Sequence, residues 1–326
     1  MIINFDKIKN SKNLLAFSAG VDSSALFFLL LNSNTPFDIA IVNYNLRDQS
    51  KEEIKYAKEL AEKYNKKIYI KDIKFESNSN FEKNARDCRY EFFEKIINKE
   101  DYDILITAHQ LNDLFEWFLM QFSKGAGLFE LLGMQELDKR DKYTIFRPLL
   151  NISRNELEEY LLKNKIKYFI DSSNKDEKYR RNYFRNKFSN EFIDKFSNGV
   201  KNSFEFLKKD INSLNLKLSA KLSFKELEIF ENLNDDNLNL KIIDKSLKKR
   251  GFIISQKQRD EILKQKEITI SHKINITINE NYIFIAPKEN TTLDKGFKEF
   301  CRIRRIPKNI RAYIYINNIK KEDLVF

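Results

Sequence analysis

The chain is poor in the residues that interrupt or cross-link a fold. Its 326 residues include only 7 glycines, 4 prolines and 2 cysteines. Cys88 and Cys301 lie far apart in the sequence, which argues against a disulfide framework, a zinc site and a CxxC redox centre. No apolar run reaches the roughly 18 residues that a membrane helix needs, and the first residues lack the apolar core of a signal peptide. These absences predict a cytoplasmic protein with no membrane association.

Charged and apolar residues are abundant instead. Hydrophobic residues make up 42% of the chain, which is enough for a packed core in two or three domains. The formal net charge is +11, and basic proteins often bind nucleic acid. Because lysine, asparagine and isoleucine are common throughout, this charge alone is only weak support for an RNA partner.

The stretch LLAFSAGVDSSALFFLLL, residues 14–31, predicts a buried strand, a tight loop and a buried helix. The loop runs from Ser18 to Ser24. Its backbone N–H groups and the positive end of the helix dipole would form an anion site. We expect Gly20 to supply a positive φ, and Asp22 to cap the helix or to position a metal. Taken alone, the pattern also fits an ordinary helix start.

Strands and helices go on alternating to about residue 122. Strands are expected at 37–42, 67–73 and 102–107, with helices at 50–64 and 81–97. This alternation predicts a doubly wound parallel sheet with ligands at the carboxyl ends of its strands. His109 follows the last of these strands, and Asp113 and Glu116 then lie on one side of the next helix. Such a pair suits Mg²⁺ or a substrate ammonium group, or merely complements the helix dipole.

Arginines accompany this region, and arginine suits the recognition of phosphate. Those singled out as contacts to an anion, tRNA or substrate are Arg86, Arg89, Arg147, Arg181 and Arg185. For the helix that carries Arg86 and Arg89, taken by itself, a solvated face is the favoured interpretation.

The rest of the chain changes character. Amphipathic helices dominate residues 188–265, and the alternation over 267–286 predicts a hairpin. Residues 301–311 are basic, with Arg304 and Arg305 as candidate phosphate contacts, and the end from residue 313 is expected to be rich in strands.

The loop at residues 18–24 resembles the SGGxDS motif of the PP-loop ATP pyrophosphatases, with Ala19 in place of the first glycine. Further segments, in order and spacing, resemble tRNA(Ile)-lysidine synthetases. They are Leu46-Arg47, Asn84-Ala85-Arg86 with Arg89-Tyr90, Thr107 to Asp113 with Glu116, Lys124 to Gly133, Arg147-Pro148-Leu149-Leu150 with Arg154, and Asp171 to Arg185. The chain departs from the family pattern at Asn43, Tyr44, Asn45, Asn112 and Lys124.

The resemblance implies a fold and a domain order. The fold is an adenine nucleotide hydrolase-like doubly wound sheet, followed by a helical domain and a small β-rich segment. The implied domains are a PP-loop ATP-binding catalytic domain at residues 1–190, a helical domain at 191–265 and a β-rich region that contacts tRNA at 266–326.

The resemblance also implies a reaction. A ligase of this family adenylates C2 of the wobble cytidine in CAU-anticodon tRNA(Ile), releasing pyrophosphate. L-lysine then displaces AMP to give lysidine. The implied catalytic residues are Asp22, Asp113 and Glu116, with Asp22 and Asp113 as Mg²⁺ ligands. The implied ATP site is Ser18, Ala19, Gly20, Val21, Asp22, Ser23, Ser24, Thr107 and His109. The sequence leaves the oligomeric state open, with a homodimer as one option.

Two other classes of function stay open. One is a different PP-loop enzyme, either a tRNA thiolase or a small-molecule amidating ligase. The chain lacks the cysteine pair of such a thiolase, and an amidating ligase would not need the basic carboxyl-terminal third. The other is a non-catalytic RNA-binding protein, which the retained Asp22, Ser23, Asp113 and Glu116 argue against.

Overall fold

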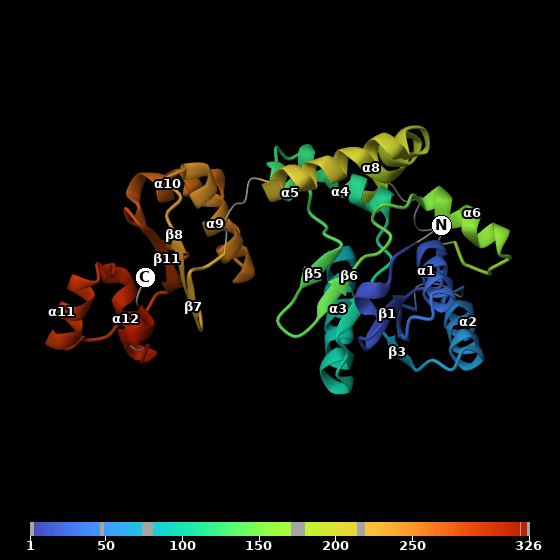
Figure 1. The fold of residues 1–326 in the computed structure, drawn as a ribbon, viewed down its shortest axis with the longest axis horizontal. Helices are drawn as coiled ribbons and strands as arrows, with labels where there is room; N and C mark the ends of the chain where they lie inside the picture. The colour runs from blue at the N-terminus through green and yellow to red at the C-terminus, as the bar shows by residue number, and fades with distance from the viewer. Residues whose placement is uncertain are drawn as a thin grey trace. The chain divides into compact units, whose positions relative to one another are not determined.

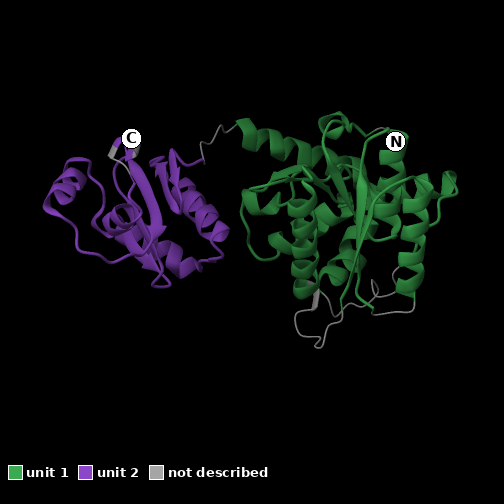
Figure 2. Cartoon of the chain, turned by 90° about the horizontal axis from the view of Figure 1, so that it is seen from below, with its two compact units in different colours: residues 1–214 green, residues 215–326 purple. Residues whose placement is uncertain are grey.

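The computed structural model of the protein describes residues 3–45, 49–73, 81–170, 180–213, 219–319 and 321–324. The chain forms two compact units, residues 1–214 (unit 1) and residues 215–326 (unit 2), shown in separate colours in Figure 2. Two segments of the family pattern, residues 46–47 and 171–179, lie outside the described residues. Within the described ranges, no helix is long and apolar enough to cross a membrane.

Unit 1 begins as an alternation of strands and helices and ends in helices (Figure 1). In chain order its elements are the 3-10 turn η1 (Asp6–Ile8), β1 (Asn13–Phe17), α1 (Val21–Asn32), β2 (Asp38–Asn43), α2 (Gln49–Lys63), β3 (Ile68–Asp72), α3 (Phe81–Glu100), β4 (Ile104–Ile106), α4 (Leu111–Phe122), α5 (Leu128–Leu131), β5 (Leu137–Lys139), β6 (Thr144–Phe146), α6 (Arg154–Lys163), α7 (Arg180–Phe184), the π-helical turn η3 (Arg185–Ser189) and α8 (Asn190–Ser213).

The sheet of unit 1 has six strands in the order β3-β2-β1-β4-β6-β5. All neighbours pair in parallel except β5, which is antiparallel to β6. From β1 the chain moves outward through β2 and β3, then returns to place β4 on the other side of β1. Strand order therefore reverses between β1 and β4, and open α/β sheets bind ligands at the carboxyl ends of strands at such a point. The predicted doubly wound sheet is confirmed.

Helices cover both faces of this sheet because side chains along each strand alternate between its two faces. Leu15 and Phe17 of β1 pack in a core with α1, α2 and α6. Leu14, on the opposite face of the same strand, packs in a second core with α3. A third core joins α4, α5 and α8, and includes Phe115 and Phe204. The helix α8 is kinked at Phe196, where φ is −128°.

Unit 2 is built on a five-stranded antiparallel sheet in the order β7-β8-β11-β10-β9. The predicted hairpin is confirmed, because β10 and β11 pair across the turn at 279–281. In chain order the elements are β7 (Leu222–Phe224), β8 (Leu227–Glu231), α9 (Asp236–Lys249), α10 (Gln256–Gln265), β9 (Glu267–Ile270), β10 (Ile274–Ile278), β11 (Tyr282–Pro287), α11 (Lys295–Ile303), α12 (Lys308–Ile316) and the 3-10 turn η4 (Lys321–Leu324).

The predicted domain boundaries differ from the division between the two units. Residues 191–265, expected as one helical domain, are shared between them: α8 packs in unit 1, whereas β7 and β8 extend the sheet of unit 2. The helices α9 and α10 pack on that same sheet, because their apolar faces share a core with β9 and β10.

The expectation of a strand-rich end from residue 313 is wrong. Residues 308–316 form α12, which buries Ile310, Tyr313 and Ile314. These residues are three and four positions apart, so a helix places all of them on one face against the sheet of unit 2. Packing of that face outweighs the strand preference of the tyrosines and isoleucines.

Candidate active site

The loop between β1 and α1 leads directly into a helix N-terminus, which is the geometry on which the predicted anion site depends. α1 begins at Val21 with Gly20 as its N-cap, and the first N–H groups of any helix have no partner within it. The hydroxyl groups of Ser18 and Ser23 lie 3.0 Å apart, and Ser18 N–H donates to Ser23 Oγ at 3.2 Å. Backbone N–H groups and two serine hydroxyls therefore lie together at the positive end of the helix, which favours an anion there.

The positive φ of this loop belongs to Ala19, not to Gly20 as expected. Ala19 has φ 59°, whereas Gly20 has φ −77°. A left-handed conformation costs a residue with a Cβ about 1–2 kcal/mol. The Ala19 methyl group is fully buried in the core of unit 1, which offsets about 0.8 kcal/mol. The Ala19 carbonyl also accepts the N–H of Phe169 at 2.9 Å. The loop thus keeps its geometry although alanine replaces a motif glycine.

A cavity of about 500 Å³ opens at the carboxyl ends of β1, β2 and β4. This volume is typical of a small-molecule site. It brings together most of the residues that the sequence singled out: Ser18, Gly20, Val21, Asp22, Ser23, Arg89, Thr107, His109, Asp113, Arg181 and Arg185. The predicted residues of unit 1 that do not line the cavity are Ala19, Ser24, Arg86, Glu116 and Arg147.

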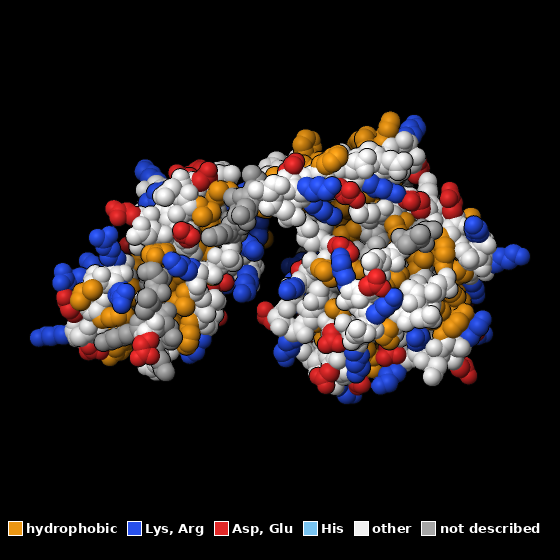
Figure 3. All heavy atoms as spheres, viewed as in Figure 1, with side chains coloured by type: hydrophobic (Ala, Val, Ile, Leu, Met, Phe, Trp, Pro, Cys, Tyr) orange, Lys and Arg blue, Asp and Glu red, His pale blue; other side chains and the backbone are white. Residues whose placement is uncertain are grey.

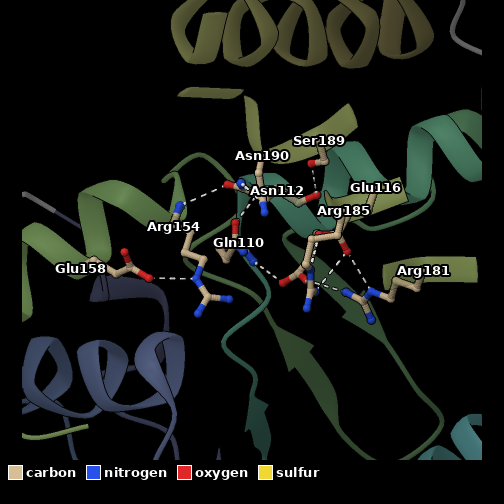
Figure 4. Close-up of polar contacts among 10 residues, drawn as sticks. Gln110, Asn112, Glu116, Arg154, Glu158, Arg181, Arg185, Ser189 and Asn190 are labelled. Atoms are coloured by element: carbon tan, nitrogen blue, oxygen red, sulfur yellow. Dashed lines mark hydrogen bonds and ion pairs between the residues drawn. The ribbon is translucent and has the colours of Figure 1, made fainter. Parts of the chain in front are cut away.

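Two arginines and two carboxylates form a network of ion pairs, of which Asp113, Arg181 and Arg185 line the cavity; Figure 4 shows the contacts of Arg181 and Arg185 with Glu116. Arg181 donates through Nε to Glu116 at 2.9 Å and through Nη2 to Asp113 at 2.5 Å. Arg185 donates through Nε to Glu116 at 2.7 Å, and its Nη2 lies 3.4 Å from Asp113. Glu116 is fully buried, and both of its oxygens accept from guanidinium groups. Glu116 therefore holds the two arginines, while Asp113 also faces the cavity.

The start of α4 fixes the carboxylate of Asp113. Gln110 caps the helix, and its N–H donates to Asp113 Oδ2 at 3.1 Å. Burial by itself would raise the pKa of Asp113, but Arg181 leads a set of groups that holds this pKa below its usual value. Asp113 is consequently ionised at neutral pH.

His109 is buried beside this group. Burial lowers its pKa to about 4, so its imidazole is neutral at pH 7. The side chain of Thr107 lies 2.9 Å from His109 Nδ1 and fixes the ring at the end of β4. His109 can therefore serve the cavity as a neutral hydrogen-bonding group.

Asp22 is held less tightly than Asp113, because Arg154 and Arg185 lower its pKa by less than burial raises it. Burial raises its pKa to about 7, and the Asp113 carboxylate adds to this rise. Among the described residues, the buried oxygen Oδ1 of Asp22 has no hydrogen-bond partner. A buried, unpaired carboxylate oxygen beside a second carboxylate is a place where a cation is favoured.

Arg154 is a cavity residue that the list of predicted site residues missed. It begins α6, donates through Nε to Glu158 at 3.0 Å, and lowers the pKa of Asp22. Its N–H donates to Asn112 Oδ1 at 3.1 Å (Figure 4). Asn112 stands where the family pattern has an aspartate, and it links α4 to α6. The signal was present in the sequence, because Arg154 ends the segment that begins with Arg147-Pro148.

The remaining predicted arginines lie elsewhere. Arg86 is exposed on α3 with its guanidinium 5.4 Å from the Tyr90 ring. Arg147 is buried and donates to the carbonyl of Gln135 at 2.9 Å, so it supports the turn before β5 instead of facing the cavity. Arg304 and Arg305 belong to unit 2, where they line a separate polar hollow.

Comparisons with known proteins agree with this geometry. A family model described as a PP-loop domain matches residues 2–192. The chain is 47% identical to a tRNA(Ile)-lysidine synthase of Campylobacter jejuni (strain RM1221) over 98% of this chain and 97% of that protein. It is 41% identical to the tRNA(Ile)-lysidine synthase of Helicobacter hepaticus over 96% of this chain and 83% of that protein.

Among solved structures, the chain is similar to a U34-tRNA thiolase of Methanococcus maripaludis. The TM-score is 0.48 and the identity 18%, over 68% of this chain and 78% of that chain. This likeness is too low to bear on function. The stretch that the PP-loop model matches contains every residue that lines the cavity of unit 1.

Proposed function

The chain belongs to the tRNA(Ile)-lysidine synthase family, and we propose that the cavity of unit 1 joins L-lysine to C2 of the wobble cytidine in CAU-anticodon tRNA(Ile). One observation carries this proposal. An anion-binding loop and a set of ionised side chains open on the same cavity at the carboxyl ends of a parallel sheet. ATP cleavage needs the anion-binding loop, and the binding of a charged amine needs the ionised side chains.

In the first step, the C2 carbonyl oxygen of the cytidine attacks the α-phosphorus of ATP. The bond to the oxygen that bridges the α and β phosphates breaks, and pyrophosphate leaves with that electron pair. The loop at residues 18–24 would hold the pyrophosphate through its backbone N–H groups and the hydroxyls of Ser18 and Ser23. Arg185 lines the same cavity and supplies positive charge close to Asp113.

Asp22 and Asp113 are the residues that would hold Mg²⁺. The unpaired Asp22 oxygen and the neighbouring Asp113 fit an ion that usually takes one or two carboxylates and completes its shell with phosphates and water. When bound, Mg²⁺ would offset the charge of the pyrophosphate.

In the second step, the ε-amino group of lysine attacks C2, and the bond from C2 to the AMP oxygen breaks. Only the neutral amine is a nucleophile, so the ammonium group must first lose a proton. Asp113 lines the cavity and would hold that ammonium group while its proton passes to solvent water. Glu116 does not line the cavity, and we assign it the role of positioning Arg181 and Arg185.

The test is pyrophosphate release from ATP and Mg²⁺ by the purified full-length chain, with and without CAU-anticodon tRNA(Ile) and lysine. We expect release that depends on the tRNA, and incorporation of lysine into it. Release driven by a small molecule without tRNA would favour an amidating ligase. Tight tRNA binding without any release would favour a non-catalytic protein.

Two serines at opposite ends of α1 provide a matched pair of variants: Ser23 in its first turn and Ser33 as its C-cap. Ser23→Ala removes a hydroxyl that bonds to Ser18 at the start of the helix, and should raise the KM for ATP about tenfold. Ser33→Ala removes a hydroxyl at the other end, which bonds to the Leu30 carbonyl, and should leave that KM unchanged. Equal effects of the two variants would contradict the ATP site. A homodimer and a cytoplasmic location stay predictions from the sequence, the first testable by the mass of the protein in solution.

A further inference from the structure

The α7–η3 segment has two chemically different faces. Its inner face, with Arg181, Asn182 and Arg185, lines the cavity. Its outer face exposes two large rings, Tyr183 at 43% and Phe188 at 48%. The change from α-helical to π-helical hydrogen bonding at Arg185 lies between these residues. Single-turn π segments are frequent at functional sites.

The outer rings form a cluster that is already in place. Tyr183 lies 5.9 Å from Phe184 and 5.8 Å from Phe188 between ring centroids. Arg180 places its guanidinium 5.7 Å from the Phe184 ring and donates to Ser123 Oγ at 2.9 Å. We call Arg180, Tyr183, Phe184 and Phe188 the outer aromatic face. These contacts restrict the rings before any partner arrives, which lowers the entropy cost of binding.

The composition of this face favours RNA as its occupant. On the face drawn in Figure 3, Lys and Arg side chains are interspersed with Asp and Glu, so charge by itself marks no RNA site on that face. On the outer aromatic face, in contrast, exposed rings occur together with Arg180, and Lys187 follows in the same segment. Rings with adjacent cationic groups are how proteins hold unpaired nucleotides.

The reaction creates nucleotides of this kind. A base that enters a cavity must leave its stack, and its neighbours in the loop then lose a stacking partner. The outer aromatic face belongs to the same short segment as Arg181 and Arg185, so its exposed rings lie within a few residues of the cavity lining and near the neighbours of a base held there.

We propose that the outer aromatic face is the stacking platform for a loop nucleotide adjacent to the modified cytidine. Tyr183 and Phe188 supply the ring surface, and Arg180 supplies positive charge for the backbone. This assignment rests on the proposed function, because it takes the wobble cytidine as the base inside the cavity.

The test is a double-mutant cycle between protein rings and RNA bases. The equilibrium Kd of the full-length chain is measured for tRNA(Ile) and for tRNA(Ile) with an abasic nucleotide on the 5′ or the 3′ side of the wobble cytidine. We expect Tyr183→Ala and Phe188→Ala each to raise Kd about tenfold, and one abasic position to do the same. Removing the ring and the base together should raise Kd little more than removing either one alone. If the losses of binding free energy from the ring and from the base simply add at both the 5′ and the 3′ position, the proposal is wrong.

Two controls keep this outcome interpretable. Phe206→Ala removes another exposed ring, at 60%, from α8 outside the outer aromatic face, and should leave Kd unchanged. Tyr183→Phe keeps the ring and should retain the wild-type response to the abasic position. A fall in the dimer fraction with Tyr183→Ala or Phe188→Ala, without coupling to either base, would instead identify a contact between two copies of the chain.

Failure of the platform is separable from failure of the proposed function. If the wild-type protein forms lysidine but the Kd cycle shows no coupling between ring and base, the platform alone is refuted. Wild-type protein that shows coupling but incorporates no lysine refutes the reaction and leaves the stacking surface standing.

Discussion

Two pairs of arginines, one in each unit, are held in opposite ways although the sequence suggested the same role for both. Arg181 and Arg185 share two buried carboxylates in unit 1. Arg305 in unit 2 is 77% exposed, and its partner Glu280, at 3.6 Å, is 88% exposed. Arg304 is exposed at the end of α11. An arginine in a basic sequence can thus be a fixed part of a site or a solvated surface charge.

The energetic difference between the pairs is large. Removal of one partner from a buried ion pair costs about 3–5 kcal/mol, because the other charge is left without compensation. An exposed pair contributes about 0–1 kcal/mol. Substitutions in unit 1 should therefore affect stability and catalysis together, whereas those in unit 2 should affect RNA binding alone.

The largest effect is expected from Glu116→Ala. It removes the buried carboxylate that accepts from both Arg181 and Arg185, and should destabilise unit 1 by about 3–5 kcal/mol and abolish lysine incorporation. Chemical unfolding and the incorporation assay measure the two effects. Glu299→Ala, which removes an exposed partner of Arg302 in unit 2, is the control and should change stability by less than about 0.5 kcal/mol. Equal unfolding midpoints for the two variants would show that the buried ion pairs stabilise the protein no more than the exposed pair does.

Asp22→Asn should separate stability from activity. The pKa of Asp22 is about 7 in the folded chain against 3.8 as its ordinary value, so the folded state binds the extra proton between these pH values. Stability therefore falls as pH rises from about 4 to 7, and the asparagine variant escapes this loss. We expect it to be more stable than wild type at pH 8 by about 2–4 kcal/mol, but to release no pyrophosphate.

The same variant tests the cation site. Mg²⁺ should raise the unfolding temperature of the wild-type protein, because it binds only the folded state, and should have little effect on Asp22→Asn. An identical response of both proteins to Mg²⁺ would count against Asp22 as a ligand.

Replacing arginine with lysine tests the role of the guanidinium fork. Arg185→Lys keeps the charge but loses the paired donors to Glu116, and should cost about 2 kcal/mol of stability and lower kcat at least tenfold. Arg304→Lys in unit 2 should leave both quantities at wild-type values. If Arg185→Lys changes neither stability nor kcat, then only the positive charge at this position matters in the cavity.

The smallest effect on the fold is expected when Arg304 and Arg305 are both replaced by alanine. Unfolding should not change, but the slope of log Kobs for tRNA against log salt should fall by about 2, one for each lost phosphate contact. Arg302→Ala is the matched control, since that side chain is already paired with Glu299 at 2.6 Å. An unchanged slope in the double variant would remove unit 2 from the RNA contact.

Local sequence was sufficient for the β1–loop–α1 region. An apolar run, small polar residues and a second apolar run leave few arrangements other than strand, loop and buried helix, and the anion site follows from the helix itself. The conformation within the loop was less predictable, because Ala19 takes the positive φ that was expected of Gly20. A hydrogen bond from Phe169, 150 positions away in the sequence, stabilises that conformation.

The partners of the charged groups could not be inferred from the sequence. Glu116 and Arg185 are far apart in the chain and meet only because α4 and η3 pack together. For the same reason Arg147, which belongs to a recognisable motif, is buried and donates to the carbonyl of Gln135 instead of facing the cavity. In unit 2, residues 308–316 form the helix α12 because a helix buries one of their faces, although their local preference is for a strand.

The sequence by itself determined the alternation of strands and helices, the phosphate loop and the order of family motifs, because each depends on residues close together in the chain. The tertiary structure decided which side of α7–η3 faces the cavity, which buried carboxylate oxygen has no hydrogen-bond partner among the described residues, and which arginines remain exposed. These outcomes depend on desolvation and on distances between groups that are remote in sequence, and both are set only when the helices pack on the sheet.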